Sequence, residues 1–286
     1  MNNTGTTMPA LPRLRSLLFV PGDRPDRMAK AAVLDADALI LDLEDSVALS
    51  AKAAARQAIA AFLAAPRRQL LFVRVNPLDS GMIDDDLAAV LPAAPDGIML
   101  PKAESGASLA ALAARLTGAT LILPIATETP AAIFGMGSYA QVSDRLCGLT
   151  WGAEDLPAAI GASTSREADG SYTAPYQLAR SLTLFGAHAA GVPAIETVYP
   201  DFRDLDGLAA YAARGRRDGF TGMMAIHPAQ VPVINAAFSP SPAEIAHARA
   251  IIDLFAANPG AGALSMDGKM IDAPHLKAAQ ALLARA

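Results

Sequence analysis

Short runs of apolar residues, many of them β-branched, recur along the chain, and most are followed by an alanine-rich segment. The runs are continuous rather than alternating in hydrophobicity, which is typical of parallel strands that are buried on both faces. The alanine-rich segments have the composition and length of helices. The pattern predicts eight strands, at residues 16–22, 38–45, 69–76, 97–103, 120–128, 145–155, 193–199 and 222–228.

Helices are predicted between most of these strands, and a shorter helix fits between the third and fourth strands. The longer ones lie at about residues 25–35, 50–65, 105–117, 174–189 and 204–217. Strands that alternate with helices over about 230 residues are typical of a (β/α)₈ TIM barrel, an α/β fold. A doubly wound open sheet is the alternative, but no glycine-rich dinucleotide fingerprint follows the first strand. We therefore predict the barrel.

A short C-terminal extension follows the barrel. We assign residues 1–240 to the barrel and residues 241–286 to the extension, as part of the same domain. The extension is predicted to hold helices at 242–257 and 274–286, and the Asp267-Gly268 pair between them favours a tight turn. Because the extension is too small for a separate core, we expect it to pack on the barrel or on a neighbouring subunit.

The composition excludes several classes of protein. The 286 residues are 52% hydrophobic and 18% charged with a formal net charge of −5, so disorder and a basic nucleic-acid-binding surface are both excluded. Cys147 is the single cysteine, which rules out an internal disulfide and fits a reducing compartment. The longest stretch without a charged residue, 219–243, contains four prolines and is no membrane span. The N-terminus lacks a signal-peptide pattern, so we expect a cytoplasmic protein with no membrane partner.

Polar residues gather at the predicted C-terminal ends of the strands, where TIM barrels carry their active sites. Each one alone is typical of a solvated loop, but seven consecutive strand ends carry them, and the carboxylates outnumber the cations. That excess indicates a bound hard cation. The residues are Asp42, Glu44, Asp45, Arg74, Asn76, Lys102, Glu104, Glu128, Glu154, Asp155, Glu196 and His227.

Magnesium is the cation we expect, because Mg²⁺ takes one or two protein carboxylates and leaves other positions to water and substrate. Glu128 and Asp155 follow adjacent strands and can reach one ion, although either residue alone is more often structural. The planar guanidinium of Arg74 suits bidentate binding of a substrate carboxylate, and the alternative is a salt bridge to an acid of the same barrel mouth. Residues 162–173 are either a lid or a solvated surface loop.

Several blocks of sequence together resemble the citrate lyase beta-subunit family, which includes malyl-CoA and citramalyl-CoA lyases among the HpcH/HpaI-type aldolases. The resemblance spans nearly the whole chain. The blocks are RSLLFVPGDRPDRMAKA (15–31), LILDLEDSV (39–47), VRVNP (73–77), LPKAES (100–105), ATET (126–129), WGAEDLPAAIG (151–161), AIHPAQV (225–231) and MIDAPHLKAA (270–279).

The resemblance implies a (β/α)₈ barrel, Mg²⁺ as cofactor, and assembly into a homotrimer or hexamer. It implies that Glu128 and Asp155 are metal ligands and that Arg74 holds the keto acid. The coenzyme A site would include Pro21, Arg24 and Lys30. The substrate site would be formed by Arg74, Glu128, Gly152, Ala153 and Glu154.

The family's C-terminal IDxPH aspartate corresponds to Asp272, which would reach the active site of a neighbouring subunit and move a proton at the acyl carbon. We interpret Glu44 and Asp45 as groups that order metal-bound water or Lys102. The function implied is Mg²⁺-dependent cleavage or formation of a β-hydroxyacyl-CoA such as malyl-CoA or citramalyl-CoA, with an acyl-CoA and a small 2-keto acid as the other partners.

Other functions stay open at this point. A malyl-CoA-type thioesterase would use the same enolate-forming site with water. A citrate lyase beta subunit would act on a carrier-bound citryl thioester and would need acyl-carrier and transferase subunits. A non-catalytic scaffold is disfavoured, because every acid of the expected site is present.

Overall fold

The computed structural model describes residues 12–141 and 144–285. Within these residues, eight parallel strands form one sheet in the order β5-β4-β3-β2-β1-β8-β7-β6. The bridges Ile122–Leu146 and Ile125–Thr150 join β5 to β6 and bring the sheet close to a closed barrel, which confirms the predicted fold. The strands are β1 (Ser16–Pro21), β2 (Ala38–Asp42), β3 (Leu70–Arg74), β4 (Gly97–Leu100), β5 (Leu121–Pro124), β6 (Leu149–Thr150), β7 (Ala194–Glu196) and β8 (Gly222–Ala225).

Alternate strand residues fill the inside of the barrel, and the residues between them face the surrounding helices. Both faces of each strand are therefore covered, which explains the continuous apolar runs. This cluster includes Leu17, Ile40, Phe72, Met99 and Met224, all buried. Gly97 leaves room for it, because a Cβ atom at that position would lie 2.3 Å from the Phe72 ring.

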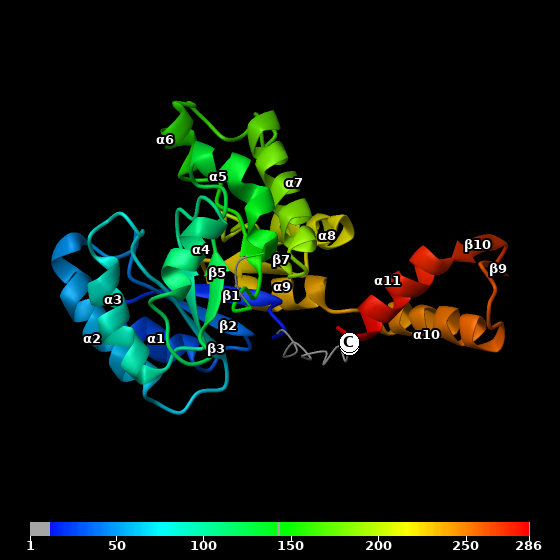
Figure 1. The fold of residues 1–286 in the computed structure, drawn as a ribbon, viewed down its shortest axis with the longest axis horizontal. Coiled ribbons are helices and arrows are strands. Elements are labelled where there is room, and N and C mark those ends of the chain that lie inside the picture. Colours follow the sequence, from blue (N-terminus) through cyan, green and yellow to red (C-terminus); the bar gives the residue numbers. More distant parts are fainter. Residues whose placement is uncertain (1–11, 142–143, 286) are drawn as a thin grey trace, which may run out of the picture. The chain divides into compact units, whose positions relative to one another are not determined.

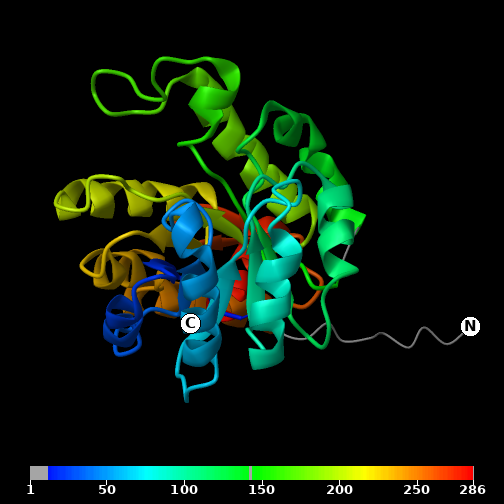
Figure 2. The same ribbon diagram turned by 90° about the vertical axis from the view of Figure 1, so that its left-hand side faces the viewer.

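Helices surround the strands, and α1, α2 and α3 lie side by side (Figures 1 and 2). Three helices that the sequence pattern did not predict are α5, α6 and α9. The first two are short and begin with or next to a proline, and α9 contains Pro232, so their local signal is weak. The helical elements of the barrel are α1 (Pro25–Ala31), η1 (Leu49–Ala51), α2 (Lys52–Leu63), α3 (Ile83–Val90), η2 (Leu91–Ala93), α4 (Gly106–Ala113), α5 (Pro130–Gly135), η3 (Met136–Gln141), α6 (Leu156–Ile160), α7 (Ala174–Ala189), α8 (Leu205–Asp218) and α9 (Gln230–Phe238).

The chain divides into two compact units between Ala237 and Phe238. The second unit contains α10 (Pro242–Ala257), β9 (Ala263–Met266), β10 (Lys269–Asp272) and α11 (Ala273–Leu283). Asp267 and Gly268, with φ of 51° and 74°, form the predicted tight turn of the β9–β10 hairpin. The hairpin and the two helices share a small core of their own that includes Ile251 and Ile271.

No helix in residues 12–141 and 144–285 is long and apolar enough to cross a membrane. Residues 1–11, for which we expect no signal peptide, lie outside the described residues.

Candidate active site

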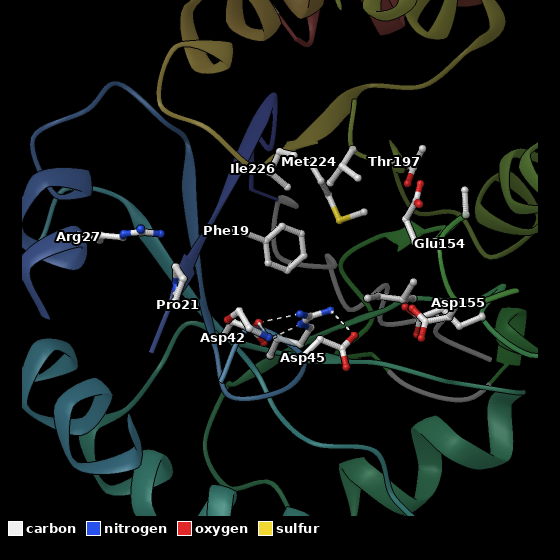
Figure 3. A pocket seen from close by; sticks show the side chains of 17 residues that line it. Phe19, Pro21, Arg27, Asp42, Asp45, Glu154, Asp155, Thr197, Met224 and Ile226 are labelled. Carbon is white, nitrogen blue, oxygen red and sulfur yellow. Dashed lines mark hydrogen bonds and ion pairs between the residues drawn. The ribbon is translucent and has the colours of Figure 1, made fainter. Parts of the chain in front are cut away.

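A cavity of about 320 Å³ opens at the C-terminal ends of the strands, and most of the predicted site residues of the barrel line it (Figure 3). One side is polar and carries Asp42 and Asp45, while Met224 and Ile226 lie across the cavity from them. Arg74 also lines the cavity, and its guanidinium carbon lies 4.9 Å from the centre of the Phe19 ring. The predicted residues that line the cavity are Pro21, Asp45, Arg74, Glu128, Gly152, Ala153, Glu154 and Asp155; Arg24, Lys30, Glu44 and Lys102 are not among the lining residues.

Arg74 is held by a bidentate ion pair. Its Nε and Nη2 atoms each donate a 2.7 Å hydrogen bond to the Asp42 carboxylate, and Nη1 lies 2.9 Å from Oε2 of Glu44. Burial opposes the charged form of Arg74, but the hydrogen bonds and the charge of Asp42 outweigh burial and raise the pKa of Arg74. The salt bridge named above as the alternative for Arg74 is therefore present, and Arg74 also lines the cavity.

Lys102 connects the acids of three strand ends. Its Nζ lies 2.7 Å from Oε1 of Glu44 and 3.6 Å from Oδ1 of Asp155. Its backbone N–H donates a 2.6 Å hydrogen bond to Oε2 of Glu128. Burial lowers the pKa of Lys102, but the hydrogen bond and charge of Glu44 raise it by more, so the ammonium keeps its proton.

Glu128 is a buried carboxylate, with 4% of its surface exposed. Burial, together with the negative charges of Glu44 and Asp155, raises its pKa to about 8. Gly152 allows the carboxylate to lie where it does, because a Cβ atom there would come within 3.0 Å of Glu128 Cγ and Oε1. A cation at this point would stabilise the charged form of Glu128.

The two carboxylates fit Mg²⁺. In the part of the chain that the structure describes, no group of three or more His, Cys, Asp or Glu side chains is placed to hold a metal ion, which disfavours an all-protein cage. Glu128 and Asp155 both line the cavity, so an ion between them would have open positions for water and substrate. This donor set, two carboxylates beside open space, suits magnesium better than zinc.

A buried network that the sequence reasoning did not identify supports the ends of β2 and β3. Lys52 Nζ donates to the carbonyls of Leu43 and Glu44 and to Asn76 Oδ1. Asn76 in turn donates through its backbone and side-chain nitrogens to Asp86, at 2.8 and 2.7 Å. Lys52 and Asp86 lie in helices, where sequence alone does not distinguish an inward from an outward position. The local signal that could have identified them is that each is a polar residue on an otherwise apolar helix face.

The predicted coenzyme A residues lie around α1. Pro21 lines the cavity, whereas Arg24 is exposed and pairs with Asp26 at 3.0 Å. Lys30 is exposed near the C-terminal end of the helix. Arg27, which the sequence reasoning did not single out, is the cation of α1 that lines the cavity (Figure 3).

Asp272 lies in the second unit, at the N-terminus of α11. Its carboxylate Oδ1 is 2.6 Å from Nδ1 of His275. Two other strand-end residues have local partners outside the cavity: Glu104 accepts a hydrogen bond from Thr129, and the His227 ring stacks on Phe202.

Residues 162–173, between α6 and α7, form hydrogen bonds with one another. Arg166 donates to the Gly170 carbonyl and to the Tyr172 hydroxyl, and its guanidinium lies 4.1 Å from the Tyr172 ring centre. The Tyr172 ring meets that of Trp151 edge-on at 5.1 Å. The segment is thus an internally bonded loop anchored on Trp151.

Comparisons with known proteins agree with this fold. The profile of the HpcH/HpaI aldolase/citrate lyase family matches residues 15–228. A citrate lyase subunit beta-like protein of Mycobacterium tuberculosis is 39% identical over 94% of each chain, and a (3S)-malyl-CoA thioesterase of Cereibacter sphaeroides is 36% identical over 95% of this chain and 94% of that one.

Among solved structures, the CitE protein of Mycobacterium tuberculosis in complex with magnesium, acetoacetate and coenzyme A superposes with a TM-score of 0.82. It is 37% identical and the match covers 96% of this chain and 99% of that chain. The barrel with its carboxylate-lined mouth therefore belongs to the HpcH/HpaI aldolase/citrate lyase family of carbon–carbon lyase-type enzymes.

Proposed function

We propose that this protein is a cytoplasmic, Mg²⁺-dependent carbon–carbon lyase that cleaves or forms a β-hydroxyacyl-CoA thioester such as malyl-CoA or citramalyl-CoA. The products of cleavage are an acyl-CoA and a small 2-keto acid. The observation that carries the proposal is that the buried Glu128 and Asp155 line one cavity, which Arg74 also lines. The complex of the related CitE protein with magnesium, acetoacetate and coenzyme A supports it.

Glu128 and Asp155 would hold the metal ion. When bound, Mg²⁺ supplies Lewis-acid polarisation of the keto acid's carbonyl and stabilises negative charge on that oxygen during cleavage. Lys102 orients both ligands, because its backbone N–H contacts Glu128 and its ammonium lies near Asp155. Glu44 in turn keeps the Lys102 ammonium in place.

Arg74 binds the carboxylate of the keto acid in this proposal. Its planar fork is already locked by Asp42, so little side-chain entropy remains to be lost when the substrate binds. Phe19, which the Arg74 guanidinium contacts, together with Met224 and Ile226 forms the apolar lining of the cavity, which excludes water from the enolate that forms on the acyl group. Gly152, Ala153 and Glu154 complete the wall beside Asp155.

The remaining proposed site residues bind coenzyme A or transfer the proton at the acyl carbon. Pro21, Arg24 and Lys30 are proposed to bind coenzyme A, and the exposed cations suit its phosphates. Asp272 is proposed to enter the site from a neighbouring subunit of a trimer or hexamer. There it would protonate the acyl carbon during cleavage and remove that proton during condensation.

The test is incubation of the protein with Mg²⁺ and a panel of β-hydroxyacyl-CoA thioesters, while free thiol and 2-keto acid are measured separately. We expect keto acid without free thiol, and loss of the product when EDTA removes the metal. Keto acid formed at the same rate in EDTA would contradict the metal's role.

A thioesterase is the second candidate, and the 36% identity to a (3S)-malyl-CoA thioesterase favours it. In the same assay a thioesterase releases free thiol without keto acid. A third outcome, no product from any coenzyme A thioester, would favour a beta subunit that acts on a carrier-bound citryl thioester and needs acyl-carrier and transferase partners.

A further inference from the structure

Glu196 is a fully buried carboxylate at the end of β7, and it does not line the cavity. Its Oε1 atom accepts hydrogen bonds from the Trp151 indole at 2.6 Å and from the Tyr211 hydroxyl at 3.0 Å. Its Oε2 atom accepts a 2.7 Å bond from Arg180, and its own neighbour Thr197 donates to Oε1 through the backbone. The carboxylate thus connects four parts of the fold, and the charge of Arg180 offsets its burial.

Trp151 connects Glu196 to the cavity, because it is hydrogen-bonded to Glu196 and directly precedes residues that line the cavity. The sheet register pairs Thr150 of β6 with Ile195 of β7, so Trp151 and Glu196 each follow the last paired residue of their strand. The four residues directly after Trp151, 152–155, all line the cavity and end at Asp155. The indole is fully buried, so its position sets where this segment begins.

The same segment is tied to β5 on its other side. The Gly152 N–H donates to the Thr127 hydroxyl at 3.0 Å, and that hydroxyl donates to the Gly152 carbonyl at 2.9 Å. Thr127 directly precedes Glu128. Residues 152–155 are therefore fixed between Glu196 on the β7 side and the Glu128 strand end on the other.

We propose that Glu196 is a positioning residue: through its hydrogen bond to Trp151 it sets the location of residues 152–155, and so the separation of Asp155 from Glu128. The inference rests on the proposed function in one respect, that these two carboxylates share a magnesium ion. Hydrogen bonds to a charged acceptor are short and strong, and a buried one restrains both partners.

Two variants alter the contact in different ways. Trp151→Phe keeps an aromatic ring but removes the contact by deleting the N–H donor. Glu196→Gln keeps the shape and weakens the contact, because a neutral amide oxygen replaces the charged acceptor and an amide NH₂ replaces the second oxygen, which Arg180 needs as an acceptor. Asp218→Asn is the matched control, because Asp218 accepts a 2.9 Å bond from the same Arg180 but has no contact with Trp151. The control reports the cost of disturbing Arg180, together with the exposed pair between Asp218 and Arg217.

Calorimetric titration with Mg²⁺ gives the first measurement. We expect Glu196→Gln and Trp151→Phe each to raise the Mg²⁺ dissociation constant about tenfold, as loss of an outer-shell contact does, while Asp218→Asn leaves it unchanged. If Glu196→Gln binds Mg²⁺ like the wild type, or if Asp218→Asn weakens binding equally, the positioning role is overturned.

Fluorescence gives a second measurement that needs no metal. Trp151 is the single tryptophan of the chain, so its anisotropy decay reports the motion of this indole alone. We expect a faster local decay in Glu196→Gln than in the wild type and no change in Asp218→Asn. If the wild type binds no Mg²⁺, the proposed magnesium-dependent function is wrong. The positioning role is tested separately, because an unchanged anisotropy decay in Glu196→Gln would overturn it whether or not Mg²⁺ binds.

Discussion

The backbone N–H of Lys102 donates a 2.6 Å hydrogen bond to Oε2 of Glu128, and Lys102 adopts a left-handed backbone conformation with φ of 49°. Within the described part of the chain, only two other non-glycine residues have a positive φ. Such backbone is strained for a residue with a Cβ atom and persists where the surroundings impose it. Here the turn directs an amide at a buried carboxylate.

Replacing Lys102 by glycine and by alanine separates the backbone strain from the ammonium. Both variants lose the cation between Glu44 and Asp155, but only alanine keeps the strain. We expect Lys102→Gly to be more stable than Lys102→Ala by about 1 kcal/mol in urea unfolding. Ala94, exposed and with φ of 50°, is the control: Ala94→Gly should exceed the wild type by a similar amount. A Lys102→Ala variant as stable as Lys102→Gly would contradict the strain.

Removing either proposed metal ligand should abolish Mg²⁺-dependent activity. Glu128→Gln and Asp155→Asn keep the shape of each side chain but remove the charge that Mg²⁺ requires. Calorimetry should show no Mg²⁺ binding in the variants, whereas Asp253→Asn, an exposed position on α10, should bind like the wild type. Full activity in either site variant would refute the assignment.

Arg74→Ala should impair use of the keto acid while sparing coenzyme A. The variant loses the fork that we assign to the substrate carboxylate, so we expect kcat/KM for the keto acid to fall by about 100-fold in the condensation direction. The dissociation constant of the acyl-CoA should stay near its wild-type value. Lys30→Ala, at one of the residues proposed to bind coenzyme A, provides the contrasting case, in which the acyl-CoA dissociation constant rises instead. Unchanged keto-acid kinetics in Arg74→Ala would argue against its role.

The Asp42–Arg74 pair should make stability depend on pH at the acid end. Burial raises the pKa of Asp42, but the hydrogen bonds and charge of Arg74 lower it by more, so that the pKa lies below the usual value of 3.8. A carboxyl with a lowered pKa in the folded state stabilises the protein above its unfolded pKa, and this contribution disappears as the pH falls through the folded pKa.

Asp42→Asn should therefore be less stable than the wild type by about 3 kcal/mol at neutral pH, because the buried Arg74 loses its bidentate partner. The difference should shrink as the pH falls below about 4. Unfolding curves at a series of pH values measure it. Asp26→Asn, whose pair with Arg24 is exposed, should show little change. A difference that grows on acidification would contradict the assignment.

Mixed oligomers test whether Asp272 serves a neighbouring subunit. Asp272→Asn and Arg74→Ala chains are each expected to be inactive alone. If Asp272 completes the site of another subunit, hybrids of the two chains contain some intact sites, and activity should return in part. Activity is measured after subunit exchange, which labelled chains can verify. Absence of rescue despite exchange would place Asp272 in its own chain's site or outside the chemistry.

Local patterns in the sequence were enough to predict most of the elements. Buried strands such as β2 are apolar at consecutive positions, because both faces of a parallel sheet are covered. The α10 helix occupies the predicted range 242–257, with Ser241 and Glu244 forming its capping box. Asp267-Gly268 predicts its turn because few residues accept a positive φ. These signals depend only on neighbours along the chain.

The partners within the site depended on contacts that no local pattern contains. The sequence identified Arg74 and the acids, but the β2–β3 register places Asp42 directly opposite Arg74 and so decides which acid it pairs with. Burial of Lys52 and Asp86, and the hydrogen bond between Glu196 and Trp151, follow from how helices and strands pack. By itself the sequence determined the barrel, its polar end and its family, because periodicity and motifs are properties of the chain. Only the tertiary structure decided which charges meet, because a charge pair in low dielectric is set by distances between strands far apart in sequence.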